Sequence, residues 1–408
     1  MTVALAALAT IAALVHDRAA PAADAKRTLV LLVGLGALAL VVARKGTTAR
    51  STRHPAWTCA LGFVALSALS ALWGLPSGLL DLGVWVGAAA VAIAVRAGGL
   101  RSSVAIMRGV ALACGGGASL AVLVSYARGL RGLWLHGGQG NPNWLGLLLA
   151  VTLPLSLEAL CAWRARPPRR PALVAFAAAS SVLQLPGLVL SHSRVAWVAT
   201  AIGLAVLVVG ARLRGTARLP RATMAIAALC ALLAIGRASP AIAALGAPSS
   251  AEATPLDSLR GRIFLARVSA GAAVRALPFG VGLGGFGHAY LAAQGEVLGT
   301  MAPKEASHRF LNATTAHDDW LQVAIESGPL AVLLLAASLG LAVVALHRAR
   351  LHGGSAALVA CGICALGDSP LRQPAVVLVV ALVLSTIPAR IHRQPVDRSG
   401  RNGLVFHV

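Results

Sequence analysis

Long apolar blocks, separated by short arginine-rich breaks, recur along most of this 408-residue chain. Hydrophobic residues make up 58% of it and charged residues only 12%, whereas a soluble globular chain carries roughly 25% charged residues. So few polar side chains cannot cover the surfaces of two or three soluble domains. The composition therefore excludes a disordered chain, a secreted disulfide scaffold and an ordinary cytosolic enzyme. It predicts an all-α polytopic membrane protein.

The apolar blocks set the expected number of spanning helices, each of which needs about 20 residues. Spans are predicted near 2–15, 28–43, 57–73, 79–97, 103–126, 143–163, 172–190, 195–211, 221–238, 318–346, 355–368 and 374–390. The first block is followed by Ala-Pro-Ala-Ala-Asp-Ala, so a helix and a cleaved signal both remain open there. We expect a membrane region over 1–238, a large loop over 239–317, a second membrane region over 318–390 and a basic tail over 391–408.

Lysine and arginine favour the cytoplasmic side of short loops, which fixes the expected orientation. With the N-terminus inside, 21 basic residues fall in the inner loops and the tail, and seven fall in the short outer loops. The chain therefore predicts cytoplasmic termini and an extracytoplasmic 239–317 loop. The net charge of +22 would suggest nucleic acid in a soluble chain. Here topology explains it, and no nucleic-acid partner is expected.

The seven outer basic residues oppose this bias, which suggests that some of them have another role. They are Arg18, Lys26, Arg27, Arg128, Arg131, Arg194 and Arg372. The planar fork of arginine donates two parallel hydrogen bonds to phosphate oxygens, so a lipid phosphate or diphosphate is a candidate partner. The alternative is simple anchoring among the lipid headgroups.

The cysteines and acidic residues give no sign of a metal site. All six cysteines fall inside apolar blocks, and the pair Cys361 and Cys364 has no second pair or nearby histidine to complete a zinc set. We interpret them as small core residues. No acidic cluster in the outer loops offers oxygen ligands for Mg²⁺ or Ca²⁺.

Two predicted outer connections carry polar motifs. In Asn141-Pro142-Asn143-Trp144, Asn141 suits a helix cap and Pro142 the first helical position, and the free amides of that helix start would also suit an anion. In Ser191-His192-Ser193-Arg194, the serines suit a tight turn and a helix cap. Arg194 would lie at the outer boundary of the hydrocarbon.

The large loop contains a predicted helix followed by a glycine-rich turn. Leu259, Ile263, Ala266 and Ala270 form an apolar stripe at helical spacing, which predicts a helix lying on the membrane or capping the bundle. Arg262 lies towards the edge of this stripe. Gly282, Gly284 and Gly287 match GxGxxG literally, but no strand precedes them, so dinucleotide binding is rejected in favour of a tight turn.

The last motif, Thr315-Ala316-His317-Asp318-Asp319-Trp320, opens the predicted span over 318–346. Asp318 or Asp319 in the first turn would complement the helix dipole. By itself, an interfacial histidine such as His317 is more often a bystander than a catalyst. The nearby arginine motifs favour catalysis.

In this order, the motifs resemble the O-antigen ligase and O-antigen polymerase superfamily of bacterial membrane glycosyltransferases. The resemblance covers roughly 139–387 and includes the Asn-Pro-Asn opening, the Ser-Arg hinge, Gly261-Arg262, Pro278-Phe279-Gly280-Val281-Gly282 and Asp368-Ser369-Pro370-Leu371. Its most specific part is His317, followed eleven residues later by Gly328. The family usually has Asn after the histidine, whereas this chain has Asp318.

The resemblance implies a fold, a location and a chemistry. The fold would be a GT-C-like bundle of about twelve helices in the bacterial cytoplasmic membrane, with the large outer loop between spans 9 and 10. The enzyme would transfer a glycan from an undecaprenyl-diphosphate carrier to an acceptor hydroxyl on a lipid or glycan, without metal or cofactor. Arg194 and Arg262 would neutralise the diphosphate, and His317 would act as general base. Substrate-binding roles are expected for Asn141, Asn143, Gly282, Gly284 and Asp318.

Two alternatives stay open from the sequence. A polymerase would use another lipid-linked glycan as acceptor, and the histidine-to-glycine spacing favours the ligase only slightly. A transporter or flippase would carry ionisable residues deep in its helices or repeated halves. Few acidic residues, Glu158 among them, lie inside a predicted span away from its ends, and no duplicated half is evident.

Overall fold

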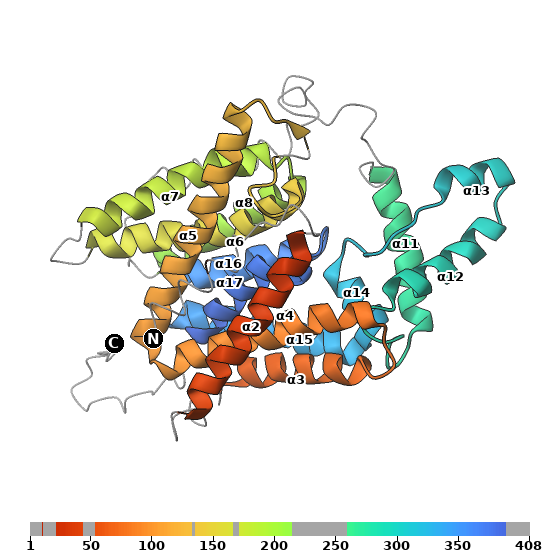
Figure 1. The fold of residues 1–408 in the computed structure, drawn as a ribbon, viewed down its shortest axis with the longest axis horizontal. Coiled ribbons are helices and arrows are strands. Elements are labelled where there is room, and N and C mark those ends of the chain that lie inside the picture. The colour runs from red at the N-terminus through yellow and green to blue at the C-terminus, as the bar shows by residue number, and fades with distance from the viewer. Residues whose placement is uncertain are drawn as a thin grey trace.

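The computed structural model describes Thr10 and residues 22–43, 54–132, 135–165, 171–213 and 259–388. This part of the chain is helical and contains no strand (Figure 1). Its first seven helices are α2 (Ala22–Ala43), α3 (Pro55–Ser70), α4 (Pro76–Ala97), α5 (Leu100–Ala127), α6 (Pro142–Ala165), α7 (Pro171–Leu190) and α8 (Arg194–Leu213). The later helices are α11 (Leu259–Arg275), α12 (Phe286–Gly299), α13 (Pro303–Arg309), α14 (Asp319–Ser327), α15 (Pro329–Arg348), α16 (His352–Cys364), η3 (Pro370–Arg372) and α17 (Pro374–Ser385).

Proline determines where many of these helices begin. Eight of the described helical segments, α3, α4, α6, α7, α13, α15, η3 and α17, have proline as their first residue. The fixed φ of proline suits the first helical position, and its missing N–H would have no partner there in any case. The sequence therefore specifies these helix starts locally.

The described helices form a bundle whose centre is α6, α16 and α17. Every residue of α17 is buried, and so is the α6 segment from Leu145 to Leu157. By contrast, α15 and α7 expose large apolar side chains, including Leu333 and Val182. Apolar side chains on the outside of a bundle suit lipid as the surrounding solvent.

The helices agree with most of the predicted spans, with one correction. Six described helices are long and apolar enough to cross a membrane, namely α4, α5, α6, α7, α8 and α15, and α3, α16 and α17 are shorter apolar helices. The single span predicted over 318–346 is wrong, because the chain breaks at Gly328, whose φ is +81°. The predicted spans near 2–15 and 221–238 lie outside the described residues, apart from Thr10. The total of twelve spans stays a prediction.

Helices α2 and α4 cross at a contact that only glycine permits. A Cβ added to Gly34 would lie 2.3 Å from the Gly87 Cα, and one added to Gly87 would lie 2.5 Å from the Val30 carbonyl oxygen. Small residues allow this close backbone approach between helices. The crossing brings the start of α2 beside α4, where charged side chains meet.

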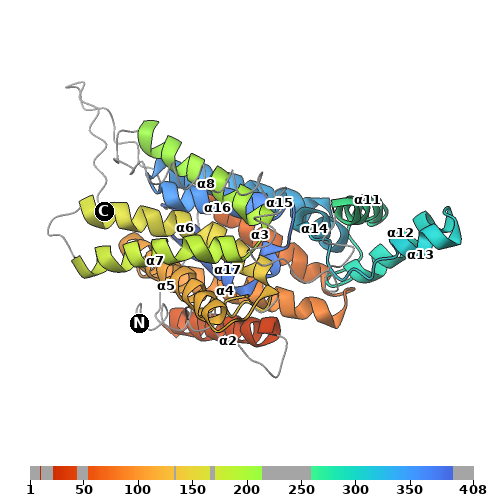
Figure 2. The same ribbon diagram turned by 90° about the horizontal axis from the view of Figure 1, so that it is seen from above.

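Helices α11, α12 and α13 lie at one end of the bundle, and α12 and α13 project away from it (Figures 1 and 2). Leu265 and Val268 of α11 pack with Phe286 and Tyr290 of α12 in a small separate core. The stripe predicted on α11 is a different face. Its members Ile263, Ala266 and Ala270 are exposed, so this part of the stripe does not pack on the bundle.

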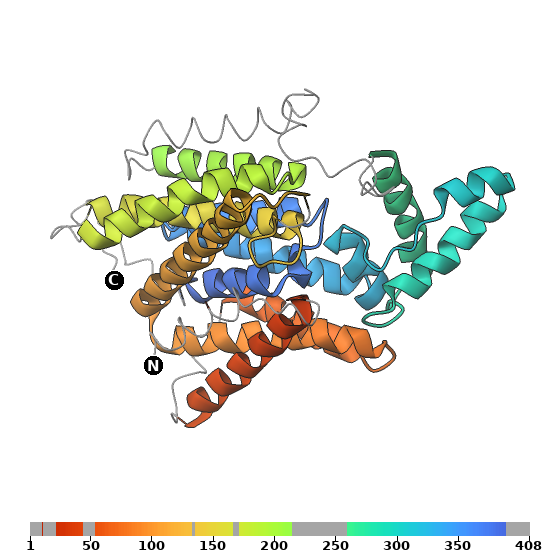
Figure 3. The same ribbon diagram turned by 45° about the horizontal axis from the view of Figure 1, so that its top comes forward.

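The connections predicted to share one side of the membrane do meet at one end of the bundle (Figure 3). Lys26 Nζ donates to Gln139 Oε1 at 3.0 Å, joining the start of α2 to the loop before α6. Leu283 N donates to Ser70 O at 3.3 Å, joining the glycine-rich turn to the end of α3. The loop before α6 and the glycine-rich turn are therefore both held at this end by contacts with other helices.

Candidate functional site

His317 lies just before α14 in a backbone conformation that few side chains adopt. Its φ is +48°, in the left-handed region that is uncommon for residues other than glycine. The next residue, Asp318, is the N-cap of α14, and its Oδ1 accepts a hydrogen bond from Leu321 N at 2.9 Å. Such unusual backbone persists where its surroundings fix it, and it occurs often at functional sites.

The carboxylate that faces His317 belongs to Asp368. Its Oδ1 lies 3.5 Å from His317 Nδ1, the Asp368 side chain is 4% exposed and that of His317 is 33% exposed. The side chain of Asp318, which directly follows His317, instead caps α14. With Nδ1 towards Asp368, Nε2 is the imidazole nitrogen left for a substrate.

Arg262 reaches the same short connection. Its Nη1 donates to the Gly367 carbonyl at 3.2 Å, and Gly367 directly precedes Asp368. Arg262 lies in the first turns of α11. On the side of His317, the N–H of Asp319 donates to Ala365 O at 2.9 Å. Residues 365–369, which we term the site turn, therefore bring Arg262 and His317 together from two separate elements.

Arg194 joins this group through the start of α8. It is the first residue of α8 and is exposed. Its neighbour Val195 contacts the site turn, because a Cβ added to Gly367 would lie 2.7 Å from Val195 Cγ2. Ser193 Oγ accepts from Ala196 N at 3.4 Å, which agrees with the predicted serine cap. The three predicted catalytic residues thus surround one turn.

The Asn-Pro-Asn motif forms the expected helix start and lies beside the Ser-Arg hinge. Asn141 Oδ1 accepts from Asn143 N at 2.8 Å, and α6 begins at Pro142. One turn later, a Cβ on Gly146 would lie 2.8 Å from both Ser191 Oγ and Ser193 Cβ. Both asparagines are half-buried. Their substrate-binding role stays a prediction.

Gly282 and Gly284 pack against backbone near the end of α3 and the start of α4. With φ of +94° and +81°, both occupy conformations that favour glycine. A Cβ on Gly282 would lie 2.6 Å from Gly74 Cα, and one on Gly284 would lie 2.7 Å from Gly78 N. This accounts for both glycines structurally. Their predicted contact with substrate is not part of this arrangement and stays a prediction.

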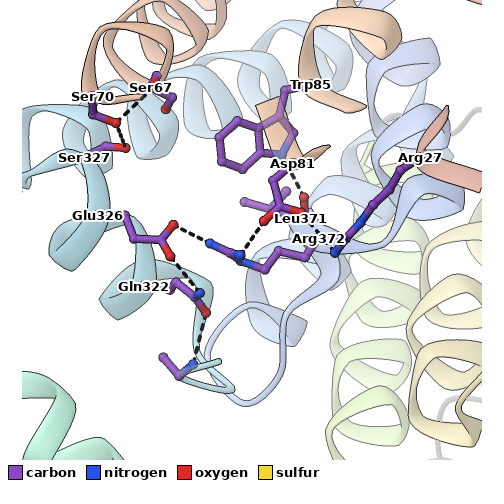
Figure 4. A network of polar contacts seen from close by, with 11 residues as sticks. Arg27, Ser67, Ser70, Asp81, Trp85, Gln322, Glu326, Ser327, Leu371 and Arg372 are labelled. Atoms are coloured by element: carbon purple, nitrogen blue, oxygen red, sulfur yellow. Dashed lines mark hydrogen bonds and ion pairs between the residues drawn. The ribbon is translucent and has the colours of Figure 1, made fainter. Parts of the chain in front are cut away.

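A buried polar network, not anticipated from the sequence, lies behind the site (Figure 4). Arg372 of η3 is ion-paired with Asp81 of α4 and with Glu326 of α14. Arg27 of α2 also pairs with Asp81 at 3.0 Å. Glu326 Oε1 in turn accepts from Gln322 Nε2 at 3.1 Å. The network joins four segments that are far apart in the sequence.

Several outer basic residues therefore have protein partners. Arg27 and Arg372 bind carboxylates of the network, Lys26 binds Gln139 and the Gly138 carbonyl, and Arg131 lies over the Tyr126 ring with its Cζ 4.0 Å from the centroid. Arg128 and Arg194 are exposed, and of these Arg194 begins α8 beside the site turn. Binding of lipid phosphate stays a prediction for Arg194, together with Arg262 of the large loop. Arg18 lies outside the described residues.

The described residues contain no cluster of side chains of the kind that binds a metal ion, and their cysteines lie inside the helices. No group of three or more His, Cys, Asp and Glu side chains there is placed to hold a metal ion. Cys114, Cys361 and Cys364 are buried and Cys59 and Cys161 are half-buried, in line with their interpretation as packing residues. Cys230 is outside the described residues.

The fold and this site define an integral membrane protein with arginine and histidine side chains gathered at one end of its helical bundle. Residues 179–336 match the family profile described as O-antigen ligase. This segment contains Arg194, Arg262 and His317, and its match supports the O-antigen ligase and polymerase superfamily that the motifs predicted. A comparison with curated proteins gave no significant match.

The cap geometry at Asp318 yields a prediction that separates structure from chemistry. Asn caps a helix as well as Asp does, so Asp318→Asn should retain wild-type thermal stability in detergent and most of the wild-type activity. Asp318→Ala removes the acceptor of the Leu321 N–H and should lower stability by about 1 kcal/mol. A large loss of activity in a stably folded Asp318→Asn variant would show that the carboxylate does more than cap α14.

Proposed function

We propose that this protein transfers a glycan from an undecaprenyl-diphosphate carrier to an acceptor hydroxyl at the outer face of the bacterial cytoplasmic membrane. The O-antigen ligase family match supports a ligase-like role in polysaccharide assembly. The observation that carries the proposal is the site turn, since Arg262, His317 and the start of α8 with Arg194 all meet there. Two arginines near the turn that carries the partner of His317 would suit release of a diphosphate.

The surroundings of Arg262 suit an amphiphilic donor. Next to it in the sequence is Ile263, which is 59% exposed, and next to Gly367 is Leu366, which is 60% exposed. A guanidinium flanked by exposed apolar side chains matches a lipid diphosphate, whose charged head continues into a hydrocarbon chain. The planar fork of arginine is also the best side-chain match for phosphate oxygens.

His317 is proposed as the general base. The acceptor oxygen attacks the anomeric carbon, the bond from that carbon to the diphosphate oxygen breaks, and the lipid diphosphate leaves with both electrons. His317 Nε2 takes the hydroxyl proton, while Asp368 stabilises the imidazolium from the Nδ1 side. Arg194 and Arg262 stabilise the charge that develops on the leaving diphosphate.

In this proposal the site needs no divalent metal, because the two arginines neutralise the leaving group. The proposed orientation has both termini in the cytoplasm and the 239–317 loop outside, within a bundle of about twelve spans. A transporter is disfavoured because the helix carboxylates of Asp81, Glu158 and Glu326 each pair with an arginine. Paired carboxylates of this kind do not form a path of titratable groups.

The proposal predicts that the arginines determine carrier affinity and that His317 determines the rate of transfer. Arg194→Lys and Arg262→Lys keep the charge but lose the bidentate fork, so carrier affinity should fall roughly ten- to a hundredfold, the equivalent of about 1.5–3 kcal/mol. His317→Ala should leave carrier affinity intact and lower the single-turnover rate by roughly 10² to 10⁴. The measurement pairs carrier-lipid affinity with single-turnover transfer for each variant.

Membrane abundance and thermal stability of each variant serve as controls, because misfolding would reduce every readout together. Near-normal turnover in His317→Ala, or a loss of carrier binding as large as in the arginine variants, would contradict the general-base role. The same assay in excess EDTA tests the proposed metal-free chemistry. Activity is expected to persist there, and a loss restored by Mg²⁺ or Mn²⁺ would overturn that part.

The glycans of a deletion strain test the acceptor class. If the enzyme is ligase-like, the deletion strain should keep long glycan on the carrier and have none on the final acceptor, because chains are built but not transferred. Products that carry single repeat units would instead identify a polymerase, the alternative within the same superfamily. Lipid-linked and acceptor-linked glycans are compared by chain length, with the wild-type gene restored on a plasmid as control. Unchanged glycans in both pools would contradict either function.

A further inference from the structure

The backbone that leads into His317 is fixed by a buried glutamine. Gln322 is 1% exposed, and its Oε1 accepts from Ala316 N at 3.0 Å. Ala316 directly precedes His317, whose φ of +48° is unfavourable for a side chain with a Cβ. Without a fixed partner on Ala316, this stretch could relax to a commoner backbone conformation and carry the imidazole away from its place.

Gln322 is itself oriented by the ion pairs behind it (Figure 4). Its Nε2 donates to Glu326 Oε1 at 3.1 Å, which leaves Oε1 of the amide to face Ala316 N. The other oxygen of Glu326 pairs with Arg372. Arg372 also pairs with Asp81, so this series of contacts runs from Gln322 of α14 to α4.

The same connection carries both Arg372 and the partner of His317. Asp368 faces His317 Nδ1 from the site turn, and Arg372 follows four residues later. Between them, Leu371 N donates to Asp319 Oδ2 at 2.7 Å. The backbone on both sides of His317 is therefore anchored. Asp319, which follows it, binds Leu371 N, and Ala316, which precedes it, binds Gln322 Oε1.

We propose that Gln322, held by Glu326 and Arg372, is a positioning residue that sets His317 against Asp368 for proton transfer. The inference rests on the proposed function, because it needs His317 to act in turnover. Gln322 reaches neither the donor nor the acceptor in this scheme. Its loss should therefore lower the rate of the chemical step and spare carrier binding.

Gln322→Met tests this proposal with a matched control elsewhere in the bundle. Met keeps the length and burial of the side chain but cannot accept from Ala316 N. The control is Gln184→Met, because Gln184 is also fully buried and bonds Thr152, Ser156 and Ser180 away from the site. We expect Gln322→Met to lower kcat about ten- to a hundredfold with carrier KM nearly unchanged. Gln184→Met should lose similar thermal stability and keep kcat within about twofold.

The decisive measurement places Gln322→Met in a His317→Ala background. A positioning residue has nothing left to position there, so the double variant should match His317→Ala within about twofold in single turnover. Arg372→Lys, which keeps the charge but cannot bridge two carboxylates as a fork, should show the same dependence on His317. It serves as a second variant should Gln322→Met be poorly stable.

The outcomes distinguish a failure of the positioning role of Gln322 from a failure of the proposed transferase function. If His317→Ala slows turnover but Gln322→Met and Arg372→Lys do not, the positioning role is wrong and the general-base role survives. An equal fold-loss from Gln322→Met with and without His317 would also overturn it, since the residue would then act independently of the imidazole. A His317→Ala variant with full turnover would remove the proposed function itself.

Discussion

The paired charges of Arg372 with Asp81 and Glu326 are the interaction on which the rest of the structure depends. A charge taken out of water is costly unless it is paired and hydrogen-bonded, and removing one partner of a buried pair leaves the other uncompensated. Asp81 is 3% exposed and Glu326 1% exposed. Their need for a cation ties α4 and α14 to η3, and this fixes the end of the bundle where the site lies.

Local sequence signals predicted the helices well, because caps and proline act over a few residues. Asn141 and Ser193 cap helices as expected, and the eight proline starts follow the same local logic. The error at Gly328 has an equally local cause. Gly328 and Pro329 are a local break signal, but the span was drawn from the apolar residues on both sides of Glu326-Ser327-Gly328-Pro329, which joined α14 to α15.

The site was predictable in its residues but not in its arrangement. Arg194, Arg262 and His317 stood out because they are polar groups in an apolar chain and matched a family pattern. The role of Asp368 beside His317 depends on a contact between residues 51 positions apart, and the partners Arg372 and Asp81 are 291 positions apart. Counting Arg372 as an outer-loop charge gave no hint of its burial. Pairings at such separations are set by helix packing, which periodicity does not encode.

We propose that the end of the bundle with the site turn faces outward, where a lipid diphosphate carrier presents its glycan. Cysteine labelling with an impermeant maleimide tests this most directly. Ser307→Cys, an exposed position in α13, probes the site end, and Ala165→Cys, at the exposed end of α6, probes the other. The account predicts that Ser307→Cys reacts in intact spheroplasts above the parent background, whereas Ala165→Cys reacts only after lysis. The reverse pattern would put the site in the cytoplasm and contradict the account.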